Sequence, residues 1–136
     1  ARDLELSRDE LPKYLEYLEK AELVSVLRMQ ANGDAILRKM DKLYLQNSNM
    51  SYVLSGENPD TGNARETIFY CWTKQKYDTV ESPVSDFEID GKTFEVGGRN
   101  KGKKQISNLK DAYVVKDTIE YVFDNQVPLW MFGFLY

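Results

Sequence analysis

The sequence predicts an α+β fold, and three observations lead to that class. The chain has 136 residues, of which 42% are hydrophobic, enough for one ordinary domain or two very small ones. Its patterns follow one another as helix, hairpin, helix, meander, helix and strands, without the strict alternation of a parallel βαβ protein. Asn32-Gly33 and Asp90-Gly91 are both dipeptides that favour tight hairpin turns.

The first helix and hairpin resemble the second half of a winged helix, which we assign to residues 1–55. An amphipathic helix ending near residue 21, with Asp9 as its expected N-cap, is indicated by the spacing of Leu11, Tyr14, Leu15 and Leu18. Residues 23–27 then have the apolar alternation of a strand. After the Asn-Gly turn, extended character resumes at residues 36–37 and 43–45.

Basic residues surround this predicted wing: Arg28, Arg38, Lys39 and Lys42. In DNA-binding winged helices the wing reaches phosphates and the preceding helix enters a groove. Here that helix carries more acidic than basic residues, namely Glu10, Glu16, Glu19 and Glu22 against Lys13 and Lys20. We therefore expect a structural wing that packs on a neighbouring domain, and keep Arg38 and Lys39 as candidate phosphate contacts.

The second part of the chain, residues 64–136, is expected to form a separate small α+β domain. A segment dense in turn formers, residues 56–63, divides it from the wing. A helix over residues 64–74 comes next. Short strands are expected at residues 77–80, 87–89, 93–96, 112–115 and 119–123, with a short helix over 104–109.

Composition excludes several classes of site. The formal net charge is −4, so nucleic acid can be bound only by a local basic patch. The chain has no histidine and one cysteine, Cys71. Disulfide frameworks, zinc sites built from His and Cys, and catalysis by an imidazole base are therefore excluded. Cys71 lies in an apolar run and is interpreted as a buried structural residue.

The chain is expected to be cytoplasmic, without a membrane association. Its most apolar segment, residues 127–136, is far shorter than the ~20 residues that a membrane span requires. The sequence opens at Ala1 without a methionine and almost directly on a helical pattern. This suggests a piece of a longer protein.

One interpretation of residues 94–105 (FEVGGRNKGKKQ) is a phosphate-binding loop, because Gly97-x-x-x-x-Gly102-Lys103 has the spacing of such loops. The hydroxyl residue that would bind magnesium is replaced by Lys104, whose charge would repel the metal. Too little chain follows for the parallel sheet that such a domain needs. We therefore reject this interpretation.

The other interpretation is a pair of carboxylates for a divalent cation. The Asp90-Gly91 turn is expected to fold two short strands together, which places Asp86 at the start of one strand beside Glu95 near the end of the other. Glu66, in the preceding helix, is the third candidate ligand. Carboxylates at adjacent strand ends suit Mg²⁺ or Mn²⁺, which prefer oxygen ligands. A surface hairpin with solvated acids has the same pattern.

An acid before a hairpin and a glutamate on its second strand, flanked by helices, resemble the PD-(D/E)XK nuclease superfamily. The order of features resembles the C-terminal region of prokaryotic AAA-type ATPases, in which a winged helix precedes a PD-(D/E)XK-like, restriction-endonuclease-like α/β/α domain. The matching segments are distributed along nearly the whole chain: residues 14–21, 42–47, 63–67, 86–89, 94–96 and 127–136.

The resemblance implies that Asp86 and Glu95 are the two signature acids and Glu66 the helix acid, with Mg²⁺ or Mn²⁺ as the possible cofactor. The signature lysine, expected two residues after Glu95, is Gly97 here. Arg99, Lys101 and Lys103 on the following loop are candidate replacements, although a glycine-rich loop is a poor platform for them. We include Lys101 in the catalytic set with Asp86 and Glu95. The basic loop offers phosphate contacts through Arg99, Lys101, Lys103 and Lys104.

These observations favour a nuclease-like module with a degenerate site that binds nucleic acid or a protein and shows little catalysis. The ATPase domain of its own parent chain is the expected partner, with DNA as a second. An active Mg- or Mn-dependent nuclease and a purely structural or oligomerisation module are the alternatives. In the last case the aromatic C-terminus would dock on the ATPase or on a second copy if exposed, whereas buried aromatics would complete the core: Trp130, Phe132, Phe134 and Tyr136.

Overall fold

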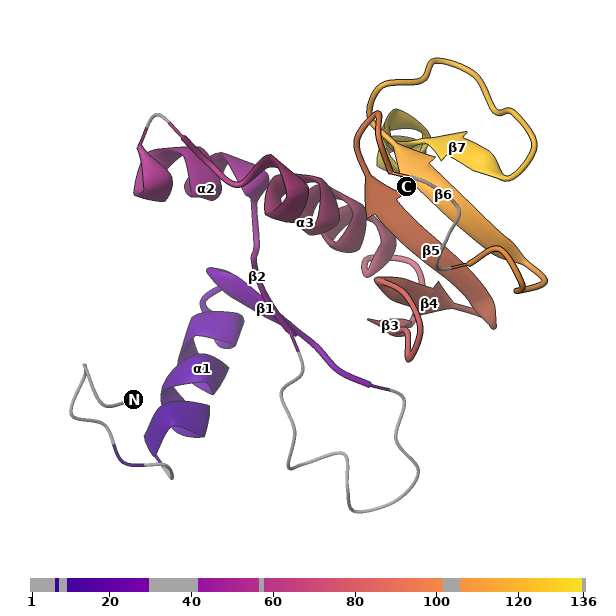
Figure 1. Ribbon diagram of the computed structural model, residues 1–136. Coiled ribbons are helices and arrows are strands. Elements are labelled where there is room, and N and C mark those ends of the chain that lie inside the picture. Colours follow the sequence, from indigo (N-terminus) through magenta and orange to yellow (C-terminus); the bar gives the residue numbers. More distant parts are fainter. Residues whose placement is uncertain (1–6, 8–9, 30–41, 57, 102–105, 136) are drawn as a thin grey trace.

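The computed structural model describes residues 7, 10–29, 42–56, 58–101 and 106–135, and it confirms the α+β class (Figure 1). A helix and a two-stranded hairpin come first along the chain. Two further helices, a five-stranded mixed sheet and a terminal 3-10 helix follow. Figure 1 shows α3 running between the hairpin and the five-stranded sheet, so that this one helix connects the two β structures.

Helix α1 (Glu10–Lys20) begins with a reciprocal capping box that the sequence analysis missed. Ser7 Oγ accepts a hydrogen bond from the Glu10 N–H at 3.2 Å, and Glu10 Oε2 accepts one from the Ser7 N–H at 2.9 Å. Ser-x-x-Glu is the usual sequence of this motif. The predicted cap, Asp9, lies outside the described residues.

Strands β1 (Val24–Leu27) and β2 (Lys42–Leu45) pair antiparallel, which confirms both predicted strands. The predicted Asn32-Gly33 turn and extended residues 36–37 lie outside the described residues. Beyond β1, Met29 forms a parallel bridge with Glu81 of the larger sheet. The Glu81 N–H also donates to the Arg28 carbonyl oxygen at 3.0 Å. The hairpin is therefore joined to the edge of that sheet by backbone hydrogen bonding.

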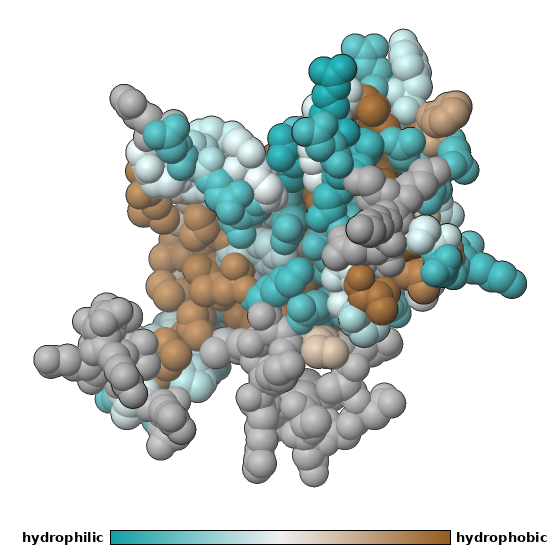
Figure 2. Space-filling view, in the orientation of Figure 1, coloured by the Kyte–Doolittle hydropathy of each residue, from teal (hydrophilic) through white to brown (hydrophobic). Residues whose placement is uncertain are grey.

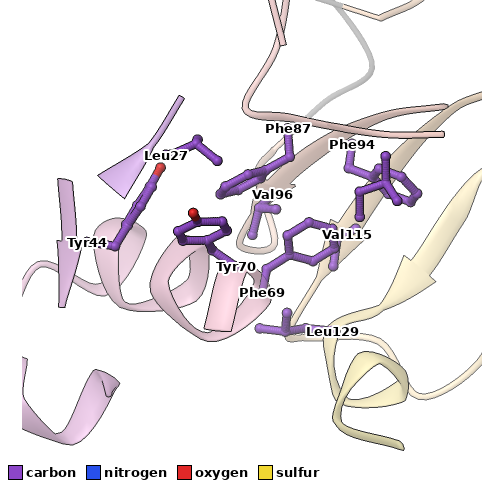
Figure 3. Packing of buried hydrophobic residues seen from close by; sticks show 10 residues of the cluster. Leu27, Tyr44, Phe69, Tyr70, Phe87, Phe94, Val96, Val115 and Leu129 are labelled. Carbon is purple, nitrogen blue, oxygen red and sulfur yellow. The ribbon is translucent and has the colours of Figure 1, made fainter. Parts of the chain in front are cut away.

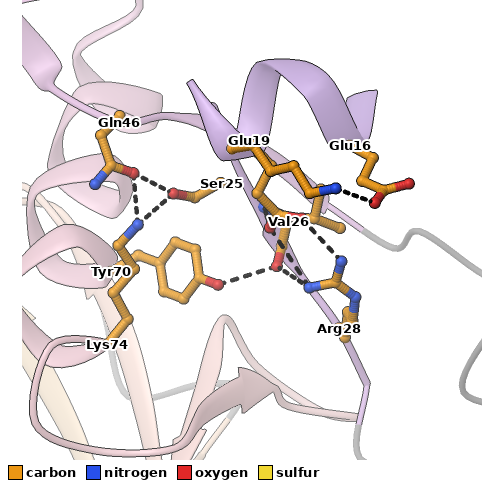
Figure 4. Close-up of polar contacts among 9 residues, drawn as sticks. Glu16, Glu19, Ser25, Val26, Arg28, Gln46, Tyr70 and Lys74 are labelled. Atoms are coloured by element: carbon orange, nitrogen blue, oxygen red, sulfur yellow. Dashed lines mark hydrogen bonds and ion pairs between the residues drawn. The ribbon is translucent and has the colours of Figure 1, made fainter. Parts of the chain in front are cut away.

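Polar side chains of the third helix hold the hairpin in place (Figure 4). Lys74 Nζ donates to Ser25 Oγ of β1 and, at 2.5 Å, to Gln46 Oε1 just after β2. Tyr70 OH donates to the Val26 carbonyl oxygen at 3.0 Å. Strand β1 and the residue after β2 are thus fixed to the C-terminal end of α3.

Helix α2 (Ser48–Ser55) was not predicted, whereas α3 (Thr61–Thr73) was predicted but begins earlier than residue 64. The Asn47 side chain caps α2 by accepting from the Asn49 N–H at 2.9 Å. Asp60 caps α3 by accepting from the Gly62 N–H at 2.9 Å, a typical use of aspartate. None of the helices within the described ranges is long and apolar enough to cross a membrane.

The larger sheet has its five strands side by side in chain order, antiparallel through the first three and parallel through the last three. Asp90 and Gly91 both have positive φ, 49° and 74°, as a tight two-residue hairpin turn requires. The predicted turn is therefore confirmed. The strands are β3 (Thr79–Glu81), β4 (Phe87–Ile89), β5 (Lys92–Gly97), β6 (Ala112–Lys116) and β7 (Gln126–Pro128).

The main hydrophobic core lies between α3 and the sheet (Figure 3). Phe69 of α3 is fully buried, and its ring centroid lies 5.0 Å from that of Phe87 on β4 and 5.5 Å from that of Phe94 on β5. Leu27 and Tyr44 of the hairpin belong to the same cluster. The predicted wing and the predicted nuclease-like domain therefore share one core.

Two expectations near the C-terminus are wrong. Residues 119–123 contain bends and one isolated bridge, from Phe123 to Gln126, instead of a strand, and the last strand comes later as β7. Tyr121 and Phe123 are 79% and 74% exposed, so these apolar residues lack the packing that a buried strand requires. The described part of the expected helix 104–109 is a turn closed by a bond from the Leu109 N–H to the Ile106 carbonyl oxygen at 3.1 Å.

The aromatic C-terminus is divided between core and surface. It forms a 3-10 helix, Leu129–Phe134. Leu129 is buried and Phe132 packs against the core, its ring centroid 4.7 Å from that of Phe69. Trp130 and Phe134 on the same helix are 50% and 65% exposed. Tyr136 lies outside the described residues.

Candidate active site at the β4–β5 hairpin

Asp86 and Glu95 lie beside each other, as the hairpin predicted. Phe87 pairs with Phe94 in the β4–β5 register, so Asp86 and Glu95 are the next facing positions. Asp86 Oδ2 accepts a hydrogen bond from the Val96 N–H at 2.8 Å, which fixes its carboxylate across the strands. Glu95 is only 1% exposed. A carboxylate buried to this extent needs compensating partners.

Lys101 supplies that compensation. Its ammonium nitrogen lies 2.6 Å from Glu95 Oε1 and 3.8 Å from Asp86 Oδ2. A turn over residues 98–101, closed by a hydrogen bond from the Lys101 N–H to the Gly98 carbonyl oxygen at 3.0 Å, directs the chain back toward the carboxylates. The structure therefore brings together the three residues of the predicted catalytic set.

Gly97, where the resemblance to PD-(D/E)XK nucleases predicts a lysine, lies under the side chain of Lys101. A Cβ atom built on Gly97 would stand 2.5 Å from Lys101 Cγ and 2.6 Å from Lys101 Cβ, distances that real side chains do not adopt. Only glycine therefore allows the Lys101 chain to cross this position. The glycine at position 97 and the position of the Lys101 side chain are therefore linked.

Two neighbours orient the Glu95 carboxylate and its lysine. Ser85 Oγ donates to Glu95 Oε2 and also lies 3.2 Å from the Phe94 carbonyl oxygen. Below the 98–101 turn, Arg65 Nε donates to Asp117 Oδ2 at 2.6 Å. The guanidinium of Arg65 packs on Gly98, where an added Cβ would meet its Cζ at 3.1 Å. The Arg65–Asp117 pair thus supports the turn that carries Lys101.

Glu66, the predicted third acid, is paired with a residue of the hairpin. Tyr44 OH donates to Glu66 Oε2 at 2.7 Å, and Tyr44 is buried. Burial raises the pKa of Glu66, and repulsion from Asp86 adds to this effect although Tyr44 opposes it. Within the described ranges, no three acidic or thiol side chains come together closely enough to hold a metal ion. The predicted three-carboxylate ligand set is therefore not formed in this arrangement.

A second lysine balances the charge on Asp86. Lys42 Nζ of β2 lies 3.8 Å from Asp86 Oδ1, on the other oxygen from that facing Lys101. Burial raises the pKa of Asp86, as does the charge of Glu95, against the opposing effects of the Val96 N–H and both lysines. Burial disfavours the charged form of Lys101, but the contacts with Glu95 and Asp86 outweigh it and raise the pKa of Lys101.

The predicted phosphate contacts are described only in part. Arg99 is exposed in the 98–101 turn. Lys101 is engaged with the carboxylates, and a third of its side chain remains exposed. The other four candidates lie outside the described residues: Arg38, Lys39, Lys103 and Lys104.

Sequence reasoning missed Tyr44 and Ser85 as parts of this site and assigned Lys42 only to the wing. Tyr44 and Lys42 belong to the hairpin, which had been treated as a separate domain, and no local pattern pairs them with residues far along the chain. Ser85 carried a weak signal, because a hydroxyl next to an aspartate at the start of a strand can reach the facing residue.

No protein-family model, curated protein or solved structure matches this chain.

Proposed function

We propose that this chain carries a nuclease-like site that hydrolyses phosphodiester bonds in the presence of Mg²⁺ or Mn²⁺. The observation that supports this proposal is the position of Lys101, 2.6 Å from Glu95 Oε1 and 3.8 Å from Asp86 Oδ2. The resemblance to PD-(D/E)XK nucleases had left the site without its lysine. In the structure, a lysine reaches the same pair of acids from four residues farther along the chain.

The residues present fit a divalent cation with oxygen ligands. Asp86 and Glu95 would hold it, because their carboxylates face each other across neighbouring strands. Glu95 Oε1 is buried and forms an ion pair with Lys101 at 2.6 Å, so a metal ion would bind this oxygen in place of the ammonium. When bound, Mg²⁺ or Mn²⁺ would supply Lewis-acid polarisation of a phosphate.

The remaining parts of the proposed reaction would be carried out by side chains of this chain. The ammonium of Lys101 would orient the attacking water and offset the negative charge that develops on the phosphate, and such a donor contributes orders of magnitude in rate. Ser85 would keep the Glu95 carboxylate in its orientation through Oε2. Lys42 and Arg99 would attract the phosphate backbone, because Lys42 lies 3.8 Å from Asp86 Oδ1 and Arg99 is exposed in the turn that carries Lys101.

The test is cleavage of plasmid and single-stranded DNA in Mg²⁺ and Mn²⁺ by the chain and by three variants, Asp86→Ala, Glu95→Gln and Lys101→Met. We expect each variant to lose at least about a hundredfold in rate, since each removes a group that acts on the reacting phosphate. Lys92→Met is the matched control, because Lys92 is exposed at the far end of the same hairpin. Cleavage that survives in all three variants, or that is absent from the unaltered chain, contradicts the proposal.

A double variant, Gly97→Lys with Lys101→Gly, asks whether the lysine acts from either position. Lys101→Gly removes the side chain that would clash with a residue at position 97. If the proposal is correct, the double variant regains part of the rate that Lys101→Gly loses. A double variant no more active than Lys101→Gly would show that position 97 cannot supply the missing group.

A non-catalytic role in binding nucleic acid is the second candidate, favoured by the absence of a three-acid metal group among the described residues. In this case the ion pairs of Asp86 and Glu95 stabilise the turn that presents Arg99. Salt-sensitive DNA binding that Arg99→Glu weakens, with no cleavage in either metal, would support it. The wider role as the C-terminal module of a prokaryotic AAA-type ATPase is part of both proposals and rests on the helix, hairpin and nuclease-like sheet in that order.

A further inference from the structure

We propose that Lys101 and the divalent cation compete for Glu95, so that this lysine lowers the metal affinity of the site that it serves. The inference rests on the proposed function, because it takes Asp86 and Glu95 to be the metal ligands. It goes beyond it by assigning Lys101 a role before any substrate arrives. The lysine occupies the cation position at rest and must leave Glu95 Oε1 when the metal binds.

The two carboxylate oxygens of Glu95 have different partners. Only Oε1 shares a cation, the Lys101 ammonium, with Asp86. Ser85 donates to Oε2, whereas Oε1 meets the Lys101 ammonium at 2.6 Å. The same ammonium lies 3.8 Å from Asp86 Oδ2. It therefore lies within reach of both carboxylates, where an ion held by both would have to lie.

An ammonium group and a divalent cation would repel each other strongly at this oxygen. A bound Mg²⁺ ion lies about 2.1 Å from its carboxylate oxygen. An ammonium nitrogen at hydrogen-bonding distance from the same oxygen would be in van der Waals contact with the Mg²⁺ ion. Both are positive, and their repulsion is strong in a site from which most water is excluded. Glu95 is 1% exposed, so screening by solvent there is weak.

Lys101 is able to move away, whereas its partner carboxylates are not. Its side chain is 34% exposed and extends from a turn, over a glycine that leaves the space for it. Asp86 is held by the Val96 N–H and Glu95 by its strand and Ser85. The expected response to the metal is therefore a change in the lysine side chain with the carboxylates in place.

The experiment measures Mn²⁺ binding directly, by calorimetry and by the electron paramagnetic resonance signal of free Mn²⁺, without substrate. Lys101→Met is expected to bind Mn²⁺ about tenfold or more tightly than the unaltered chain, because one like charge next to the ion is removed. Lys101→Arg keeps the charge and should show no such gain. Lys42→Met should gain less, since Lys42 approaches only Asp86 Oδ1 at 3.8 Å, and Lys92→Met should not change.

Glu95→Gln separates the inference from the function on which it rests. If Glu95→Gln abolishes binding while Lys101→Met binds no tighter than the unaltered chain, the competition is wrong and the proposed metal site stands. If none of the proteins binds Mn²⁺, including Lys101→Met, both are wrong.

Loss of Lys101 leaves the buried Glu95 charge unpaired and is expected to weaken folding. Thermal unfolding with and without Mn²⁺ gives a second readout, because an ion that binds the folded chain stabilises it. The rise in Tm on adding Mn²⁺ should be larger in Lys101→Met than in the unaltered chain. An equal or smaller rise contradicts the competition.

Discussion

Helices α1 and α3 have opposite relations to the core, although the first has the clearer amphipathic pattern. No described residue of α1 is buried, and Tyr14 and Tyr17 are 48% and 61% exposed. Helix α3 buries five residues: Ala64, Thr67, Phe69, Tyr70 and Thr73. Regular spacing thus indicates that a helix forms, whereas burial depends on which elements the rest of the chain places beside it.

The molecular surface shows a related difference between the N-terminal elements and the five-stranded sheet. Figure 2 shows apolar side chains gathered over the region of α1, the hairpin and α2, while the face of the sheet region seen there is mostly hydrophilic. Val53 and Leu54 of α2 are 81% and 71% exposed. The hairpin therefore connects the N-terminal elements to the core, because its residues Leu27 and Tyr44 are buried.

The largest difference between the two helices is expected for aromatic truncation. Phe69→Ala removes a fully buried ring that contacts Phe87, Phe94 and Phe132. The free energy of unfolding should fall by about 3–5 kcal/mol. Tyr17→Ala on α1 is the matched control and should stay within about 0.5 kcal/mol, as exposed substitutions usually do. Urea denaturation measures both, and similar losses would show that α1 is covered in solution.

Tyr44→Phe is expected to have the next largest effect, because Tyr44 is the hairpin residue that connects core and site. It removes the hydrogen bond to Glu66 Oε2 and leaves the ring buried. Loss of one such bond to a partly buried carboxyl group should cost about 1–2 kcal/mol. Tyr14→Phe, an exposed tyrosine of α1, is the control for the same change. If the two variants are equally stable in urea, the bond makes no net contribution.

A change in pH is expected to have a weaker effect on the free energy of unfolding. The pKa values of Asp86 and Glu66 are raised, but by contributions that partly oppose one another. An acid with a raised folded pKa binds protons more readily in the folded state than in the unfolded one. Stability therefore falls as pH rises from the ordinary carboxyl range through the folded pKa values. Urea titrations between about pH 4.5 and 8 should show a shallower fall for Glu66→Gln. An unchanged slope would mean that Glu66 does not titrate in this window.

The β4–β5 hairpin and the N-terminal elements also differ in how well the sequence predicted them. The Asp90-Gly91 turn and strand β4 were predicted at their observed positions, because the signals are local: a dipeptide that accepts positive φ, and apolar residues flanking it. From that turn followed the pairing of Asp86 with Glu95. Helix α2 was missed because its serines and asparagine have low helix propensity, and it depends on the Asn47 cap.

The long-range part of the site was beyond local reasoning. Tyr44 is 22 positions from Glu66, and the register that brings them together comes from the shared core, not from a spacing rule. Lys101 was considered as a replacement for the lysine missing at Gly97, and the flexibility of a glycine-rich loop argued against it. In the structure, Gly97 gives the Lys101 side chain room to cross, and Gly98 gives the Arg65 guanidinium room to pack beneath the turn. The glycines thus determine the position of the lysine.

The smallest effect is expected at the start of α1, and it shows how far this helix is from the core. Ser7→Ala removes the Oγ that accepts from the Glu10 N–H, a cap worth about 1 kcal/mol or less at an exposed helix end. Hydrogen bonds from Ser7 also lower the pKa of Glu10, so this pKa should move back toward its ordinary value. Amide exchange should speed up in the first turn of α1 and remain unchanged in α3. A matching increase in α3 would show that the two helices unfold as one unit, since a cooperative unit opens together.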